Sequence, residues 1–243
     1  MSIILNHHGI ASLGMTDCLF LTYFDSFDND TKVDNPLVGP ECRYSDDGQS
    51  YELSSLNLFG VTQNSILNNY SSSSKYNFIF QEDIPSGVKY ISSELFVLTS
   101  GTRGDLSSGI YLNPSLMALD SLWSNTEFGS AGPLTADGRV TEFFNDATYS
   151  TWNYLKPGIN IRYKLSHLAM VWDLENNVET YYVDGIIQAR IQLIEQDRKD
   201  FYAIRFGQNG VGKSFNITGI AIWAKNMSIN GGMSYPVPTK RYA

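Results

Sequence analysis

The stretch from His167 to Ile194 constrains the fold more than any other part of the sequence. Two runs rich in β-branched and aromatic residues are joined there by the polar turn Leu174–Asn177. Asp184 and Gly185 then precede a third such run. An Asp-Gly pair is typical of a type I′ hairpin, because both central residues of that turn need a positive φ. The stretch therefore predicts three consecutive antiparallel strands.

The same alternation, with a period of two, recurs along most of the chain, whereas long helical periodicity is missing. Clusters of Gly, Asn, Asp, Ser and Pro separate the alternating runs. Besides the three strands above, we predict strands at 18–24, 51–59, 76–80, 90–98, 140–144, 201–206 and 215–224. A short helix is predicted at 113–123, where Asn113 can cap and Pro114 suits the first helical position. Many short strands separated by turns predict an all-β, antiparallel β-sandwich with short helical turns.

The composition agrees with one large globular domain. A chain of 243 residues that is 42% hydrophobic and 13% aromatic can bury a core. Its two cysteines, Cys18 and Cys42, are too few for a disulfide scaffold, and free thiols are the expected state. We assign residues 41–243 to a single sandwich and residues 1–40 to an irregular N-terminal arm or edge segment. We recognise no signal peptide and no transmembrane run, so no membrane partner is expected.

The charge is unevenly distributed. The net charge of −8 argues against a nucleic-acid partner. Acidic residues exceed basic ones over the first 150 residues, and the reverse holds over the last third. Such opposed halves favour packing against other protein subunits, and the alternative is an ordinary solvated surface.

The segment HLAMVWDLENNVETYYVDGIIQARI resembles the laminin-G-like and pentraxin-like branch of the concanavalin A-like sandwiches. In that branch one strand opens with His, and the return strand ends in an aromatic residue, a β-branched residue and Asp-Gly. His167 and Tyr182–Gly185 match this pattern, and Phe206-Gly207 and Phe215–Ser228 match its last two strands. The resemblance covers about residues 140–230 and implies a jelly-roll sandwich. It leaves function open, because the superfamily includes lectins, adhesion modules, glycosidases and virion proteins.

Two motifs suggest an enzyme, but neither has the context that its chemistry needs. Residues 207–214 match the phosphate loop G-x-x-x-x-G-K-[ST], yet the residues that follow alternate as a strand where that loop needs a helix. Glu195 to Asp200 resembles the E-x-D-x-x-E signature of glucanases, but the intervening residues are polar. A hydrolase triad is not indicated, because the chain has only three histidines and no G-x-S-x-G motif. His167 is expected to be packed and hydrogen-bonded. We expect no catalytic residue.

Aromatic and amide side chains in loops are the candidates for ligand binding. Sugar sites stack aromatic rings on a pyranose, and Asn or Asp side chains bind its hydroxyls. Trp123, Trp152 and Asn177 are therefore the candidate ligand-binding residues. Trp172 and Trp223 lie on alternating strands and are expected in the core.

Oxygen-rich turns are candidates for calcium, which binds carboxylate and amide oxygens. The candidate metal ligands are Asp28, Asp30, Asp34 and Asp173. Their spacing does not follow an EF-hand loop, and polar turns without metal are the favoured interpretation. No cofactor is therefore expected, and calcium is the one alternative.

The sequence favours a non-catalytic structural or interaction protein that displays the sandwich outward. The first hypothesis is an accessory of a virus particle, such as a capsid decoration, head-fibre or tail component, with its own copies or other virion proteins as partners. This places the chain on a virion surface, and otherwise in the cytoplasm. The alternative is a lectin-like module that binds glycans with or without calcium, and a glycoside hydrolase ranks last.

Overall fold

The computed structural model describes residues 15–44, 49–70, 77–99, 107–111, 128–129, 132–133, 149–154, 164–193, 201–209 and 214–242. The elements are η1 (Met15–Asp17), β1 (Cys18–Thr22), β2 (Val33–Asp34), β3 (Cys42–Arg43), β4 (Gln49–Leu58), β5 (Val61–Tyr70), β6 (Asn77–Asp83), β7 (Tyr90–Thr99), β8 (Ser107–Tyr111), β9 (Phe128–Gly129), β10 (Gly132–Pro133), β11 (Tyr149–Tyr154), β12 (Leu165–Asp173), β13 (Val178–Val183), β14 (Ile186–Leu193), β15 (Phe201–Asn209), β16 (Ser214–Trp223) and η5 (Asn230–Gly232). Among these residues, no helix has the length and apolar character needed to cross a membrane.

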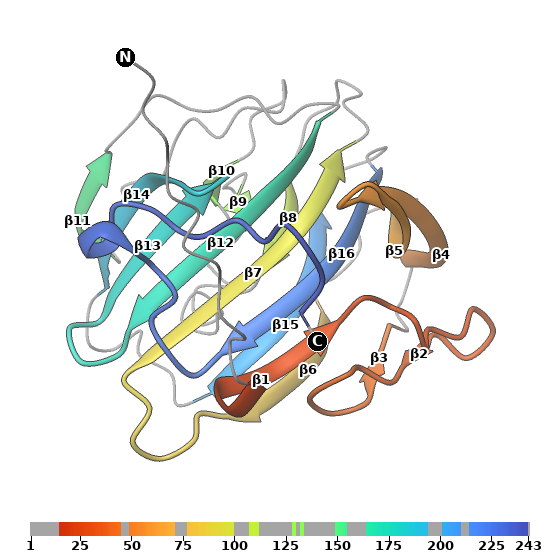
Figure 1. The fold of residues 1–243 in the computed structure, drawn as a ribbon, viewed down its shortest axis with the longest axis horizontal. Coiled ribbons are helices and arrows are strands. Elements are labelled where there is room, and N and C mark those ends of the chain that lie inside the picture. Colours follow the sequence, from red (N-terminus) through yellow and green to blue (C-terminus); the bar gives the residue numbers. More distant parts are fainter. Residues whose placement is uncertain are drawn as a thin grey trace.

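Antiparallel pairing joins most strands into two sheets (Figure 1). The larger sheet has nine strands in the order β11-β14-β13-β12-β7-β16-β5-β4, and β1 pairs with β16 as well. The smaller sheet, β6-β15-β8, lies behind it in the view of Figure 1. The predicted all-β, antiparallel sandwich is confirmed.

Strands of the large sheet alternate between two buried faces, because successive side chains of a strand point to opposite sides. On β16, Ile220 and Ile222 join the core that also contains Tyr202 and Ile204 of β15. This inner core therefore lies between the two sheets. Trp223 belongs to a second buried cluster on the outer face.

Both tryptophans that we placed in the core are fully buried there. Trp172 and Trp223 each have 0% of their surface exposed. Trp172 packs in the inner core and Trp223 in the outer cluster. The prediction for these two residues is confirmed.

The Asp-Gly turn forms as predicted. Asp184 and Gly185 have φ values of 48° and 77° between β13 and β14. The turn is tied to the start of β12, because the His167 amide donates to Asp184 Oδ1 (2.8 Å) and the Asp184 amide donates to the His167 carbonyl (2.8 Å). Lys164 Nζ also contacts Asp184 Oδ2 at 2.5 Å. These bonds fix the Asp-Gly turn against the main chain of β12 at His167.

Strand β16 changes neighbours at Gly219. Its first half, Ser214–Ile217, pairs with β5, and its second half, Ile220–Trp223, pairs with β1. Gly219 has a φ of 61°, and a Cβ at this position would lie 3.2 Å from the rings of Phe96 and Tyr23. The bulge at Gly219 therefore lets β1 and the curled β4–β5 hairpin share one side of the same strand (Figure 1).

Residues 224–242, which we call the strap, cross the outer face of the large sheet (Figure 1). The Tyr235 amide donates to the Gly185 carbonyl (3.0 Å), and the Tyr182 hydroxyl donates to the Gly232 carbonyl (2.7 Å). Met227 and Tyr235 pack in the outer cluster with Trp223. The strap therefore covers a face that would otherwise expose aromatic side chains to water.

Several details differ from the sequence expectations. Strands β5, β8 and β11 and the two-residue strands β2, β3, β9 and β10 were not predicted. The predicted elements at 113–123 and 140–144 lie outside the described residues. Residues 18–22, within the segment assigned to an arm or edge, pair with β16. Both cysteines are free, as expected, and both are buried; burial raises the pKa of the Cys18 thiol to about 12.

Candidate functional site

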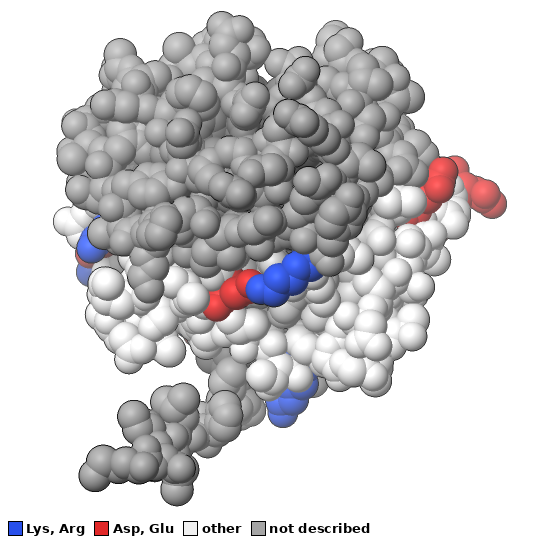
Figure 2. All heavy atoms as spheres, turned by 90° about the horizontal axis from the view of Figure 1, so that it is seen from above, with Lys and Arg blue, Asp and Glu red and all other residues white. Residues whose placement is uncertain are grey.

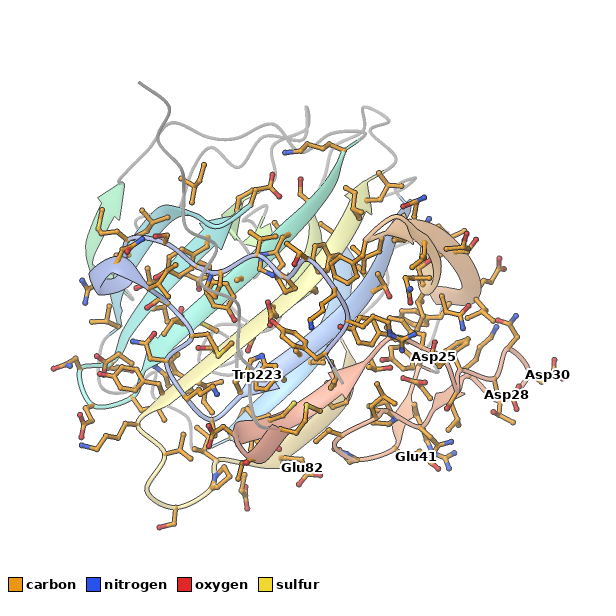
Figure 3. All side chains as sticks on the ribbon, in the orientation of Figure 1. Asp25, Asp28, Asp30, Glu41, Glu82 and Trp223 are labelled. Carbon is orange, nitrogen blue, oxygen red and sulfur yellow. The ribbon has the colours of Figure 1, made fainter. Side chains whose placement is uncertain are left out.

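Two of the proposed metal ligands lie at the tip of the loop between β1 and β2 (Figure 3). Asp28 Oδ1 accepts hydrogen bonds from the amides of Asp30 (2.8 Å) and Thr31 (3.4 Å). These backbone bonds lower the pKa of Asp28. The Asp28 carboxylate therefore stabilises its own turn, as Asp side chains commonly do.

Asp34 does not lie in the loop, since it belongs to β2 and is fully buried. Its Oδ2 accepts from the Thr22 hydroxyl (2.6 Å), whereas Oδ1 has no hydrogen-bond partner within the described part of the chain. Burial raises the pKa of Asp34 above its ordinary value of 3.8, the Thr22 bond opposes this, and nearby Asp25 adds to it.

This raised pKa makes stability depend on pH. A folded state with a raised carboxyl pKa binds the proton more tightly than the unfolded chain, so the contribution of Asp34 is greatest below pH 3.8 and falls as the pH rises through the folded pKa. We expect the unfolding free energy of the native chain to fall relative to Asp34→Asn between pH 4 and 7 in urea titrations. Asp28→Asn is the control: because the pKa of Asp28 is lowered, the native chain should lose stability relative to this variant only as the pH falls toward and below 3.8, and the two pH profiles should stay parallel at higher pH. Parallel pH profiles for the native chain and Asp34→Asn would contradict the assignment.

Asp173 and Asn177 hold the turn between β12 and β13. Asp173 Oδ1 accepts from the amides of Glu175 (3.1 Å) and Asn176 (2.9 Å). Asn177 adopts a φ of 54°, and its Oδ1 accepts from Trp172 Nε1 (3.3 Å). Both side chains therefore bond within this turn region, and the predicted polar turn at Leu174–Asn177 is confirmed.

The other predicted residues are not brought together. The backbone of Trp152 pairs with Ile191 at the edge of the large sheet, and Trp123, Glu195 and Asp200 lie outside the described residues. Across the described ranges, no three His, Cys, Asp or Glu side chains converge on a point that could hold a metal ion. The phosphate-loop match continues into strand β16 at Ser214 and not into a helix, as expected.

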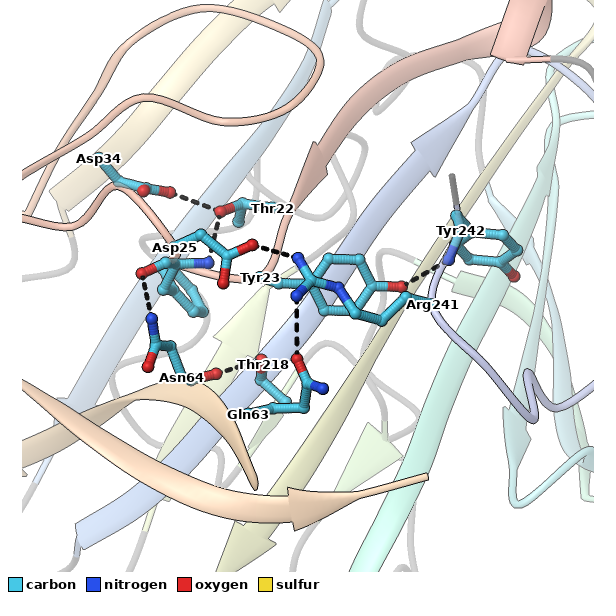
Figure 4. A network of polar contacts seen from close by, with 10 residues as sticks. Thr22, Tyr23, Asp25, Asp34, Gln63, Asn64, Thr218, Arg241 and Tyr242 are labelled. Atoms are coloured by element: carbon cyan, nitrogen blue, oxygen red, sulfur yellow. Dashed lines mark hydrogen bonds and ion pairs between the residues drawn. The ribbon is translucent and has the colours of Figure 1, made fainter. Parts of the chain in front are cut away.

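A partly exposed polar group lies where the end of the strap meets β1 and β5 (Figure 4). Arg241 Nη1 donates to Gln63 Oε1 (3.2 Å), and Nη2 is paired with Asp25 Oδ2. The guanidinium lies over the Tyr23 ring, with Cζ 4.2 Å from the ring centroid. The side chains of Arg241 and Asp25 remain 33% and 43% exposed. We call Asp25, Gln63 and Arg241 the rim.

A closed polar cluster lies beside the rim, on the outer face of the large sheet. Glu94 is 1% exposed and accepts three side-chain hydrogen bonds. Trp223 Nε1 (3.0 Å) and the Tyr242 hydroxyl (2.7 Å) donate to Oε1, and His167 Nε2 lies 2.7 Å from Oε2. Because a carboxylate only accepts, His167 carries a proton on Nε2. We call these four residues the Glu94 cluster.

Tyr242 and Tyr23 link the rim to the Glu94 cluster. The Tyr242 amide donates to the Tyr23 hydroxyl (3.0 Å), and the Tyr242 ring lies edge-on to Trp223 with centroids 4.9 Å apart. Burial, and then the charge and hydrogen bond of Glu94, raise the pKa of Tyr242 far above its usual range. Burial also raises the pKa of Tyr23 to about 12. Both phenols therefore stay protonated; the Tyr242 hydroxyl donates to Glu94, and the Tyr23 hydroxyl accepts from the Tyr242 amide.

Among the described residues on the face seen in Figure 2, charged side chains do not form one large patch. The described surface there is mostly uncharged, and its acidic and basic side chains stand in small separate groups.

Sequence analysis did not identify the rim or the Glu94 cluster. Asp25 and Arg241 are 216 positions apart, and Glu94 and His167 are 73 apart. The sequence offers one signal for the Glu94 cluster: Glu94 is the single acid in the otherwise uncharged run ISSELFVL of β7. A carboxylate buried in such a strand needs hydrogen-bond donors around it.

No protein-family model matches this sequence, and no curated protein does. Solved structures show a partial likeness. The chain is similar to the globular domain of T. cruzi calreticulin, with 10% identity, a TM-score of 0.45, and coverage of 86% of this chain and 89% of that one. It is similar to arcelin-5, a lectin-like defense protein from Phaseolus vulgaris, with 8% identity, a TM-score of 0.37, and coverage of 74% and 94%.

A third likeness is to the binding domain of botulinum neurotoxin serotype C1, with 11% identity and a TM-score of 0.43. The match covers 88% of this chain but spans only 50% of that chain. Because all three TM-scores are below 0.5, the assignment to the antiparallel β-sandwich class is based on the strand pairing described above.

Proposed function

We propose that the protein is a non-catalytic, lectin-like recognition module that binds glycans at the rim. The observation that supports this is the Arg241 guanidinium, held between Asp25 and Gln63 on the ring of Tyr23 while a third of its side chain stays exposed. Each sugar hydroxyl both donates and accepts a hydrogen bond. A carboxylate, a carboxamide and a guanidinium side by side supply both roles, and their shared contacts hold them in place.

A binding role suits these side chains better than a catalytic one. Asp25 accepts from Arg241, and Glu94 accepts from three donors. Carboxylates held this way act as acceptors, whereas a general acid needs a proton that it can release. We therefore propose a reversible complex and no bond cleavage.

A glycan array probed with the full chain, with and without EDTA, tests the proposal. We expect binding in at least one condition, and loss of signal with EDTA would indicate calcium assistance. In titration calorimetry with a glycan found on the array, Asp25→Asn should weaken binding by about tenfold, or about 1.4 kcal/mol. Asp28→Asn is the matched control, since it removes the same charge from the same loop outside the rim (Figure 3). An array without signal in both conditions, or equal loss in both variants, would overturn the proposal.

The role as an accessory of a virus particle stays a prediction from the sequence. It requires association with copies of the chain or with other particle proteins. Light scattering after size-exclusion chromatography tests this role, because a strict monomer that does not associate with particles would contradict it.

A further inference from the structure

We propose that the groups around the end of the strap form a peptide-binding site that recognises Arg followed by Tyr, and that Arg241 and Tyr242 are its resident occupants. The site consists of the partners of these two residues and the groups that hold them: Asp25, Gln63, Tyr23, Glu94, Trp223 and His167. The ligand class is an extended peptide segment that presents these two side chains. The glycan proposal keeps Arg241 on Asp25 and Gln63, whereas this proposal has a peptide take the place of its side chain. Because the test below involves no sugar, either proposal can fail without the other.

The first position of the site binds a guanidinium. Asp25 and Gln63 each accept from one terminal nitrogen of Arg241, and the Tyr23 ring lies under its plane. These contacts need the planar, forked donor set of Arg, which Lys lacks. The position therefore selects Arg by shape as well as by charge.

The second position binds a phenol. Glu94 Oε1 accepts from the Tyr242 hydroxyl (2.7 Å), and Trp223 offers an edge contact to the ring. Glu94 is held in place by Trp223 and His167, so the acceptor is present before the phenol arrives. A Phe ring has no hydroxyl, so the buried Glu94 Oε1 would lose the hydrogen bond that it accepts from Tyr242.

A backbone hydrogen bond between the two positions places them at the spacing of two adjacent residues of a peptide. The Tyr242 amide donates to the hydroxyl of Tyr23, whose ring also supports the guanidinium (Figure 4). Peptide-binding sites recognise a short sequence by combining main-chain hydrogen bonds with side-chain contacts. Here one main-chain contact and two side-chain contacts fall on consecutive residues. All acceptors of the site come from residues at least 148 positions away in the sequence, so the strap lies on a surface that the rest of the fold builds.

The test uses the full chain with Arg241→Ala and Tyr242→Ala, which keeps the site and removes the two side chains that occupy it. The probe is the dye-labelled peptide Pro-Val-Pro-Thr-Lys-Arg-Tyr-Ala, which has the sequence of residues 236–243, and the readout is fluorescence anisotropy. We expect saturable binding to this double variant. Binding to the native chain should be much weaker, because the tethered occupant competes at an effective concentration of order millimolar.

Altered peptides and one altered chain separate recognition from charge attraction. Phe in place of Tyr, or Lys in place of Arg, should weaken binding by at least about tenfold, since a bond to a charged group is lost. Ala in place of the exposed Lys240 is the control and should bind like the parent peptide. Adding Asp25→Asn to the double variant should also weaken binding. No binding to the double variant, or equal binding of the parent and the Phe and Lys peptides, would overturn the proposal.

Discussion

Gly185→Ala is expected to lower the unfolding free energy by roughly 2–5 kcal/mol, in two parts. An L-residue at a φ of 77° costs about 1–2 kcal/mol. The new Cβ would also lie 2.7 Å from the Tyr235 carbonyl oxygen and 3.0 Å from Val237, both in the strap. Overpacking of this kind costs about 1–3 kcal/mol. Urea unfolding followed by tryptophan fluorescence measures the sum.

Gly60→Ala separates the two parts of this effect. Gly60, between β4 and β5, has a φ of 79°, but a Cβ there would meet nothing within 4 Å. Its substitution should cost only the backbone part, about 1–2 kcal/mol. Gly185→Ala should also speed hydrogen exchange at the Tyr235 amide, which bonds to the Gly185 carbonyl. Equal losses in the two variants would show that strap packing at Gly185 adds nothing.

The hairpin that contains Gly185 was predictable because its signals are local. An Asp-Gly pair selects a backbone conformation by itself, and the β-branched residues on both sides continue as strands. Strand β5, Val61–Tyr70, was missed for the opposite reason. Its sequence VTQNSILNNY is rich in Asn, Gln and Ser, which are typical of turns, and it becomes a strand by pairing with β4 and β16. Tertiary pairing overrides local preference there.

The candidate site was not predictable because it depends on what covers the outer face of the large sheet. Periodicity shows that β12 and β16 have two faces, but it does not reveal that the strap lies across one of them. The strap has little periodicity of its own, and its sequence contains Gly, Asn and Pro that favour turns. Trp223 was correctly placed in a core, yet its hydrogen bond to Glu94 depends on strand order.

Glu94→Ala is expected to be among the most destabilising single substitutions in the described part of the chain. It removes the acceptor of Trp223, Tyr242 and His167 at once. A buried donor left without an acceptor costs about 1–3 kcal/mol, and here three donors lose their acceptor together. We expect a loss of at least about 3 kcal/mol in urea unfolding, with the end of the strap released to proteolysis. A loss below about 1 kcal/mol would show that the three donors find other acceptors.

Glu94→Gln distinguishes the loss of charge from the loss of acceptors. The carboxamide oxygen can still accept from Trp223 and Tyr242, but its nitrogen donates where the carboxylate accepted. His167 must then accept at Nε2 and carry its proton on Nδ1, which has no hydrogen-bond partner among the described residues. The cost should be about 1–3 kcal/mol, less than that of Glu94→Ala, because one donor is orphaned and not three. Nitrogen NMR shifts of the His167 ring should report the change of tautomer. An unchanged tautomer with full stability would mean that the pair of His167 and Glu94 contributes little to holding the outer face together.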